Sequence, residues 1–487
     1  MLKYLHFFCS LLIINVINAQ PPELSKQQMY DDFDFLFEKV QKVSPHMAIR
    51  KQITGIDILS NIYKLRESID TINSNILFTD MLHRALYLAM EPHNDFTDIY
   101  PYHDRDSSFI GQVLDYYYYY FQYYKYGHYR VLPLVYFNGD YYLPQLYHSD
   151  EKNIKIPARS KLLKVNGIPI EEYNRQWSMP LYTESRWDFI YKKLFTTAIF
   201  PPYVAGLGDD FLLTYEHNGV IREIEAFPYY IKSAPSTKFS PKVHYLQKDD
   251  ILYIRVPEMD ASQIEFYKSE ILKYKGKLIK KVVIDVRANE GGNDAVWEQI
   301  LAVIIDKPVE ATQKLCFKDN NLVRECLERD RIVYTKEIPL IIGNDTLFCI
   351  EDTRNIAPAE KSLSYEGNIY VLTDRDCYSS TLAFIAFCEN FDNLITVGTP
   401  TGYLGGEGIR PFYFILPNTM HIFITSCSLD GNIKTDNIED YYHDKVKIPV
   451  YPDIDYYYIE TEYEGDFYNE EYLYNHDPVF KKVLELE

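Results

Sequence analysis

Residues 282–294 read VVIDVRANEGGND, and this stretch decides the fold. An apolar run enters a turn with two consecutive glycines, and a segment of helical character begins at Asp294. A buried strand that passes through a tight turn into a helix is the unit from which parallel α/β sheets are built. Consecutive glycines before a helix also let main-chain N–H groups face an anion, although an ordinary tight turn would explain them too.

The same arrangement recurs along residues 236–460. Residues 368–373 are an apolar strand, and a turn at 374–379 leads into a helix over 380–388. Further strands are expected at 251–256 and 394–397. Such alternation predicts an α/β core with a mostly parallel sheet, whose active groups lie on turns at the carboxyl ends of the strands.

Two other regions precede this core, so the fold class is α/β and multi-domain. Residues 20–100 form an N-terminal helical subdomain, because apolar side chains recur there at helical spacing. Residues 101–235 form a β-rich module with hairpin turns at Asn166-Gly167 and Asn218-Gly219. The five tyrosines at 116–120 are explained by strand packing or by a carbohydrate- or peptide-binding platform. Residues 461–487 are expected to be a C-terminal tail.

The N-terminus indicates export. Lys3 precedes an apolar stretch from Leu5 to Val16, and Ala19 supplies a small residue at a cleavage site. Because this stretch is shorter than the roughly 20 residues of a membrane helix, residues 1–19 are interpreted as a signal peptide rather than an uncleaved anchor. No later segment is apolar enough to span a bilayer, so we expect a periplasmic or extracellular protein without a stable membrane span.

Composition restricts the partners and cofactors. The formal net charge is −20, which argues against nucleic acid because phosphate binding requires a basic surface. The six cysteines after Cys9 match no zinc spacing, and no His-Glu-Xaa-Xaa-His or phosphate-binding loop occurs, so neither metal nor cofactor is expected. Export permits a disulfide of Cys316 with Cys326 or Cys349, and buried free thiols are the alternative.

Ser379 is the candidate nucleophile. It lies where an expected strand turns into a helix, so its hydroxyl would sit at the sheet edge. The next main-chain N–H, that of Ser380, would point at a tetrahedral oxyanion. Helix N-caps are also commonly serine, and capping alone would explain this position.

The order of the motifs supports catalysis, because together they resemble the tail-specific or C-terminal processing peptidases related to the core of tricorn protease. The motifs that carry the resemblance are RANEGG at 287–292, YSS at 378–380, GTPTG at 398–402 and YPDI at 451–454. Upstream, residues 158–170 look like the PDZ-like module of these proteins. Glu91-Pro92-His93-Asn94 stands where they have an Asp-Gly-His-Thr turn.

This resemblance implies a role for each matched residue. Ser379 matches the nucleophile, and the N–H groups of Ser380 and of Gly291 or Gly292 match the oxyanion hole. One branch of the family uses a lysine as base, but Leu404 occupies that place here. His93 matches the histidine base of the other, tricorn-like branch. Glu439, with Asp440 as the alternative, matches the acidic residue that orients it.

The sequence therefore predicts an exported serine-type peptidase that acts on peptides or protein tails; its oligomeric state is left open. One alternative is a peptidase fold without activity that binds peptides or cell-surface polymers. Another is an acyl hydrolase of a different kind, against which the absence of a Gly-Xaa-Ser-Xaa-Gly elbow argues.

Overall fold

A computed structural model gives the fold for most of the chain. The predicted signal peptide, the tyrosine run, Leu404 and Glu439 lie outside the residues that it describes. The described residues are 23–89, 91, 93–97, 130–143, 147–149, 154–175, 186–199, 211–226, 229–230, 240–334, 336–342, 344–402, 411–430, 446–463 and 465–486.

The centre of the protein is a six-stranded sheet of order β15-β16-β17-β21-β22-β26. All neighbours are parallel except β15 and β16, so the predicted mostly parallel α/β core is confirmed. The strands are β15 (Lys242–Leu246), β16 (Ile251–Arg255), β17 (Lys281–Asp285), β21 (Ile369–Thr373), β22 (Leu394–Gly398) and β26 (Ile448–Pro449).

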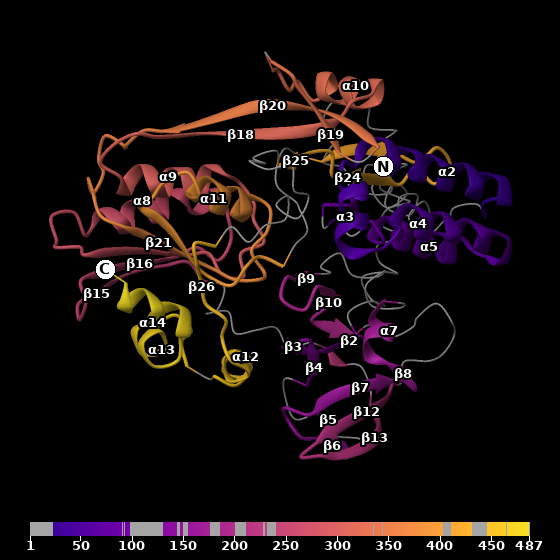
Figure 1. Cartoon of the computed structure of the whole chain (residues 1–487), viewed down its shortest axis with the longest axis horizontal. Coiled ribbons are helices and arrows are strands. Elements are labelled where there is room, and N and C mark those ends of the chain that lie inside the picture. Colours follow the sequence, from indigo (N-terminus) through magenta and orange to yellow (C-terminus); the bar gives the residue numbers. More distant parts are fainter. Residues whose placement is uncertain are drawn as a thin grey trace, which may run out of the picture.

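Helices cover both faces of this sheet (Figure 1). One face carries α8 (Ile264–Leu272), α9 (Ala295–Ile304) and α11 (Ser380–Cys388). The short η7 (Ala261–Gln263) directly precedes α8. Trp297 of α9 stacks on Phe384 of α11 with ring centroids 5.2 Å apart, which joins the two helices that follow the glycine and serine turns. The C-terminal helices cover the other face.

The segment predicted as a C-terminal tail is a folded part of the core. After α12 (Ile454–Glu462), it contains α13 (Glu470–Asn475) and α14 (Pro478–Glu485). Buried side chains of these helices, among them Tyr472 and Phe480, pack against Tyr253 and Tyr370 of the sheet. The apolar residues at helical spacing in 478–485 are the reason, since they complete an otherwise uncovered sheet face.

The predicted helical subdomain is present but shares its core with later segments. Its helices are α2 (Lys26–Val43), α3 (His46–Thr54), α4 (Ile58–Leu65), η1 (Arg66–Thr71) and α5 (Asn75–Tyr87). One cluster of buried side chains joins Phe33 and Leu82 of these helices with Phe317, Phe348 and Phe423. Residues 309–356 and 411–430 lie between core elements in the sequence, but they pack with the N-terminal helices.

These later segments form two small sheets, of order β1-β24-β23 and β19-β20-β18-β25. The long antiparallel pair of β18 and β20 runs from the α/β core to the helices along the top of Figure 1. The elements are β1 (Asp95–Thr97), β18 (Val309–Lys318), α10 (Asn321–Arg329), β19 (Ile338–Ile342), β20 (Asp345–Ile356), β23 (Phe412–Ile415), β24 (Ile422–Thr425) and β25 (Leu429–Asp430).

A disulfide joins Cys316 to Cys349 across the paired strands β18 and β20. This is one of the two pairings that the sequence left open. Cys326, the other candidate partner, is a buried free thiol on α10.

The described part of residues 101–235 is rich in strands, and its largest sheet has the order β13-β12-β7-β4-β3. Both predicted hairpins are present, around Asn166-Gly167 and Asn218-Gly219. The elements are β2 (Arg130–Pro133), β3 (Val135–Phe137), β4 (Asp140–Tyr142), β5 (Tyr147–Ser149), β6 (Ile154–Ile156), β7 (Lys161–Val165), β8 (Ile168–Pro169), α7 (Ile170–Tyr173), β9 (Arg186–Asp188), β10 (Lys193–Phe195), β11 (Ala198–Ile199), β12 (Phe211–His217), β13 (Val220–Ala226) and β14 (Tyr229–Tyr230).

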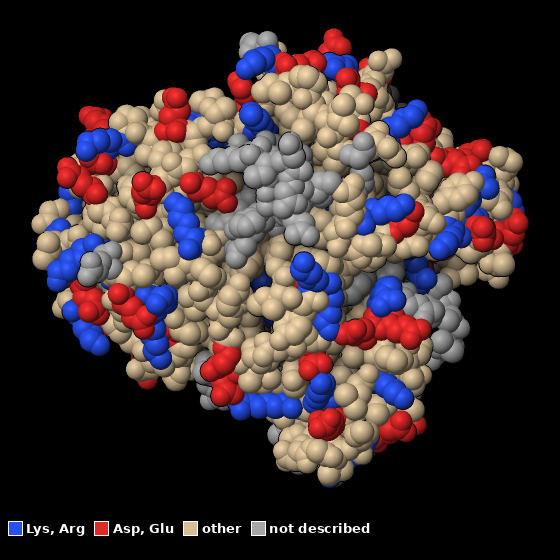
Figure 2. Space-filling model, viewed as in Figure 1, with Lys and Arg blue, Asp and Glu red and all other residues tan. Residues whose placement is uncertain are grey.

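The acidic excess is not gathered into one patch on the face shown in Figure 2, where acidic and basic side chains are interspersed. Among the described residues, no helix combines the length and apolar composition needed to cross a membrane.

Candidate active site

The glycine turn and the serine turn meet at one edge of the central sheet. They follow β17 and β21, which are parallel neighbours, so their carboxyl ends lie side by side. Asp374 accepts hydrogen bonds from the N–H of Ala288 at 2.9 and 3.0 Å, and Tyr378 N–H donates to Asn289 O at 3.1 Å. The Cys377 thiol donates to Val286 O at 3.3 Å. Three contacts thus hold the two predicted turns together.

Gly291 lies directly against the candidate nucleophile. A Cβ at this position would lie 2.6 Å from Ser379 Cβ and 2.9 Å from Ser380 N. Its φ of +104° is also one that side chains disfavour. Only glycine therefore allows the turn to approach Ser379 this closely.

The main-chain N–H groups at the two turns differ in their partners. Gly291 N–H donates to Asn289 Oδ1 at 2.8 Å within its own turn. Neither Gly292 N–H nor Ser380 N–H donates to any atom of the described residues. Of the two glycines predicted to face an oxyanion, Gly292 is therefore the one with an uncommitted donor.

Ser379 has an unusual backbone conformation, with φ +54° and ψ −121°. Such strain costs on the order of 1–3 kcal/mol for a residue with a side chain, and it occurs most often at functional sites. Ser379 lies at the N-cap position of α11, but its side chain makes no capping hydrogen bond. The capping explanation for this serine therefore fails.

The Ser379 hydroxyl contacts His93 instead, with 3.0 Å between Oγ and Nε2. His93 lies 286 residues earlier, between the helical subdomain and β1. Pairing of β1 with β24 fixes this segment to the body of the protein. The His93 side chain is 25% exposed, so it can be reached from solvent.

Among the described residues, the carboxylate in contact with the histidine is that of Glu91, which the sequence analysis did not select. Glu91 Oε1 lies 3.3 Å from His93 Nδ1 and accepts a hydrogen bond of 2.5 Å from the Tyr378 hydroxyl. Its other oxygen pairs with Arg50, and all of Glu91 is buried. Burial raises the pKa of Glu91, but Arg50, the His93 hydrogen bond and His46 outweigh it, so the pKa lies well below its usual value.

A family model agrees with this geometry. The model of peptidase family S41 matches residues 250–426, which include both turns and Ser379. Residues 250–426 therefore form a peptidase family S41 domain. The predicted resemblance and the predicted enzyme class, a serine-type peptidase, are thereby confirmed.

Solved structures share the S41 fold over nearly the whole chain. A serine-to-alanine mutant of CPAF has a TM-score of 0.56 at 14% identity, with 90% of this chain and 96% of that chain covered. Mature CPAF complexed with lactacystin has a TM-score of 0.54 at 15% identity, covering 86% and 93%. No curated protein matches the sequence.

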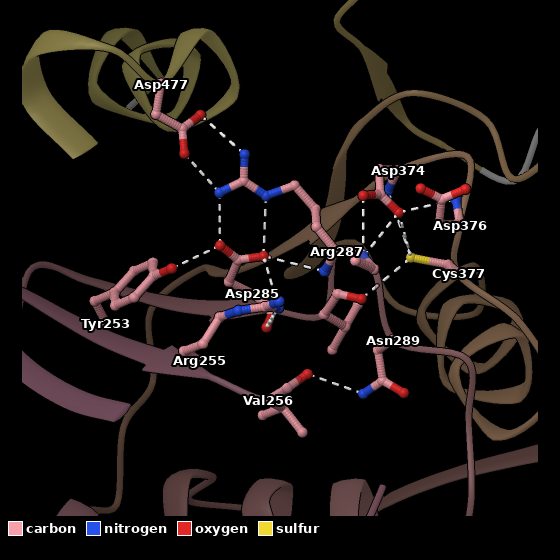
Figure 3. Close-up of polar contacts among 12 residues, drawn as sticks. Tyr253, Arg255, Val256, Asp285, Arg287, Asn289, Asp374, Asp376, Cys377 and Asp477 are labelled. Carbon is pink, nitrogen blue, oxygen red and sulfur yellow. Dashed lines mark hydrogen bonds and ion pairs between the residues drawn. The ribbon is translucent and has the colours of Figure 1, made fainter. Parts of the chain in front are cut away.

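A buried ion network supports the glycine turn of this S41 domain. Arg287 donates to Asp285 at the end of β17 and to Asp477 at the start of α14, and Tyr253 also donates to Asp285 (Figure 3). Burial raises the pKa of Asp285, but the charges of Arg287 and Arg255 outweigh it, and the carboxylate stays ionised. The turn is therefore anchored both to the end of β17 and to the start of α14.

The structure thus brings together most of the residues that the sequence selected for the S41 site: Ser379, Ser380, Gly291, Gly292 and His93. Glu439 lies outside the described residues and stays a prediction. Glu91 was missed because it was treated as a departure from the family's Asp-Gly-His-Thr turn; the signal was a carboxylate two positions before the histidine. Among the described residues, no three His, Cys, Asp or Glu side chains cluster in a way that could hold a metal.

Proposed function

We propose that this S41 peptidase is an exported serine endopeptidase that cleaves peptides or protein tails through an acyl-enzyme. The observation that carries the proposal is the 3.0 Å contact between Ser379 Oγ and His93 Nε2. A serine hydroxyl is a weak nucleophile unless a base within hydrogen-bond reach accepts its proton.

In acylation, Ser379 Oγ attacks the scissile carbonyl while His93 Nε2 takes its proton. The carbonyl electrons move onto oxygen, and the resulting oxyanion accepts from the N–H groups of Ser380 and Gly292. Donors of this kind contribute on the order of 100- to 1,000-fold in rate. When the C–N bond breaks, the leaving amine receives the proton from His93 Nε2.

In deacylation, water replaces the amine. The water oxygen attacks the ester carbonyl while His93 Nε2 takes one of the water protons. His93 then returns that proton to Ser379 Oγ when the ester bond breaks. The peptide leaves with a new carboxylate, and the enzyme regains its starting state.

A fluorophosphonate probe tests this proposal, because the probe reacts with a serine that a neighbouring base activates. We expect the wild-type chain to be labelled and to cleave a peptide mixture, and Ser379→Ala to lose both properties while keeping the thermal unfolding temperature. Peptide cleavage that survives Ser379→Ala would contradict the proposal.

The second candidate function is an inactive fold that holds peptides or cell-surface polymers. It is favoured by departures from the family's catalytic motifs, among them Ala288, which stands where the family has the glycine of Arg-Gly-Asn. The same probe distinguishes the two candidates. Peptide binding without any labelling of the wild-type chain would favour binding over catalysis.

Export belongs to the proposal because the Cys316–Cys349 disulfide suits an oxidising compartment. We expect the secreted chain to lack residues 1–19 and to begin at Gln20. Mass spectrometry of the N-terminal peptide from culture medium or periplasm checks this, and an intact Met1 terminus on cytoplasmic protein would contradict it.

A further inference from the structure

The Tyr378 hydroxyl lies between His93 and the buried carboxylate of Glu91. It donates to Glu91 Oε1 at 2.5 Å, and His93 Nδ1 lies 2.8 Å from the same phenol oxygen. A phenol has one proton to donate, and an ionised carboxylate can only accept. The Tyr378 oxygen is therefore left to accept the proton of His93 Nδ1.

This arrangement fixes the tautomer of His93. When Nδ1 carries the proton of the neutral ring, Nε2 has a free lone pair, and Nε2 is the atom that faces Ser379 Oγ. With the proton on Nε2 instead, the ring could not accept the serine proton.

We propose that Tyr378 is a positioning residue, which connects the Glu91 carboxylate to His93 and takes the role for which the sequence predicts Glu439. The inference rests on the proposed roles of Ser379 and His93. Tyr378 is the shorter connection, because Glu91 Oε1 itself lies 3.3 Å from His93 Nδ1.

The carboxylate end of this chain of contacts is held rigidly. Arg50 is fully buried, pairs with Glu91 Oε2 and donates to Ala89 O at 2.6 Å. His46 lies 3.9 Å from the same carboxylate oxygen and 2.9 Å from Ser428 O. These contacts orient Glu91 Oε1 toward Tyr378 before any substrate binds.

The tyrosine end is held in a fixed position relative to the nucleophile, because Tyr378 directly precedes Ser379 in the strained turn. During acylation the proton of Ser379 Oγ passes to His93 Nε2, and the ring becomes an imidazolium. No proton leaves Nδ1, since Tyr378 keeps its own proton and Glu91 stays ionised. Tyr378 and Glu91 act by holding the ring in place and by stabilising its positive charge.

Steady-state kinetics of Tyr378→Phe tests this role, with Tyr267→Phe as the matched control. The Tyr267 hydroxyl is also buried, but it donates to Arg255 O at 3.2 Å, away from His93. We expect Tyr378→Phe to lower kcat about 10- to 100-fold with KM unchanged, because a hydrogen bond to the charged ring is lost. The control is expected to keep both constants.

Glu91→Gln and Glu439→Gln complete the kinetic comparison. We expect Glu91→Gln to lower kcat, and the double variant Tyr378→Phe/Glu91→Gln to lose little more than the worse single variant, since the two groups act in series. Full loss of kcat in Glu439→Gln with wild-type kcat in Tyr378→Phe would overturn the inference.

A spectroscopic measurement decides the inference even if the protein cleaves no peptide. Nitrogen-15 chemical shifts of labelled histidine distinguish a protonated from an unprotonated ring nitrogen, and His93→Gln assigns the His93 signals. At mildly alkaline pH we expect wild-type His93 to be protonated on Nδ1 alone, and Tyr378→Phe to give a mixture of tautomers. A single Nδ1–H tautomer in both proteins would show that Tyr378 does not fix the ring, and would overturn the proposal.

Discussion

Asp477, ten residues from the C-terminus, joins the last helix to the turn that supports the nucleophile through a bidentate pair with Arg287. Its oxygens lie 3.0 and 2.5 Å from the guanidinium nitrogens. The same carboxylate caps α14, accepting from the N–H groups of Val479 and Phe480 at 3.0 and 2.9 Å. One buried side chain thus connects the C-terminal helices to β17 and the glycine turn.

Asp477→Asn is expected to destabilise the fold by about 3–5 kcal/mol, because removing one partner of a buried ion pair leaves a charge uncompensated. Urea unfolding measures the loss. Asp466→Asn is the control, since Asp466 pairs with Lys242 near the surface, where an ion pair contributes about 0–1 kcal/mol. Equal losses in the two variants would contradict the anchoring role of Asp477.

Gly291→Ala is expected to reduce fluorophosphonate labelling and kcat by about 100-fold or more, because the new Cβ displaces Ser379 and Ser380 N–H from their productive positions. Gly276→Ala is the matched control. Gly276 also has a positive φ, +85°, but a Cβ there would meet no atom within 4 Å. Both variants carry backbone strain, so a difference between them in labelling reports the contact with Ser379. An active Gly291→Ala protein would contradict the close approach of the turns.

The sequence was sufficient for the α/β core because each strand-turn-helix unit there is short and locally encoded. Residues 380–388 form a helix with the predicted bounds, and the strand predicted at 394–397 extends by one residue to Gly398. The contact of His93 with Ser379 followed from the family resemblance, since nothing local in the sequence indicates a pair 286 residues apart.

Other features depend on contacts that no local pattern encodes. The sequence predicts a tail at residues 461–487, whereas the helices of this segment pack against Tyr253 and Tyr370 of the sheet. The role of Glu91 depends on the hydroxyl of Tyr378, which lies 287 residues later, and on Arg50 of α3, which lies 41 residues earlier. These partners meet only when the helical subdomain packs against the core.

Removal of the disulfide by Cys316→Ala/Cys349→Ala is expected to lower the free energy of unfolding by about 3–4 kcal/mol. The bridge closes a loop with a sequence separation of 33, and this loop-closure entropy is the main expected contribution. Thermal unfolding with and without a reductant checks the source of the loss. The reductant should lower the unfolding temperature of the wild type and leave that of the double variant unchanged; a reductant-sensitive double variant would show that the effect lies elsewhere.

Acid should weaken the fold through His46, which lies beside the Glu91–Arg50 pair. Burial and the charges of Arg50 and His93 lower the pKa of His46 to about 4, although Glu91 and Ser428 O partly oppose this. The unfolded chain binds a proton near pH 6.5, whereas the folded chain does so only near pH 4. The stabilisation by neutral His46 is therefore complete above pH 6.5 and is lost as the pH falls toward 4.

The loss through this one group is on the order of 3 kcal/mol. Because buried His421 has its pKa lowered to about 3 and acts with the same sign, His46→Gln should reduce the pH slope of stability without abolishing it. Urea unfolding of both proteins at several pH values between 4 and 7 measures the two slopes. Parallel slopes would mean that His46 gains a proton in the folded state as readily as in the unfolded chain, and that its burial next to Glu91 does not keep it neutral.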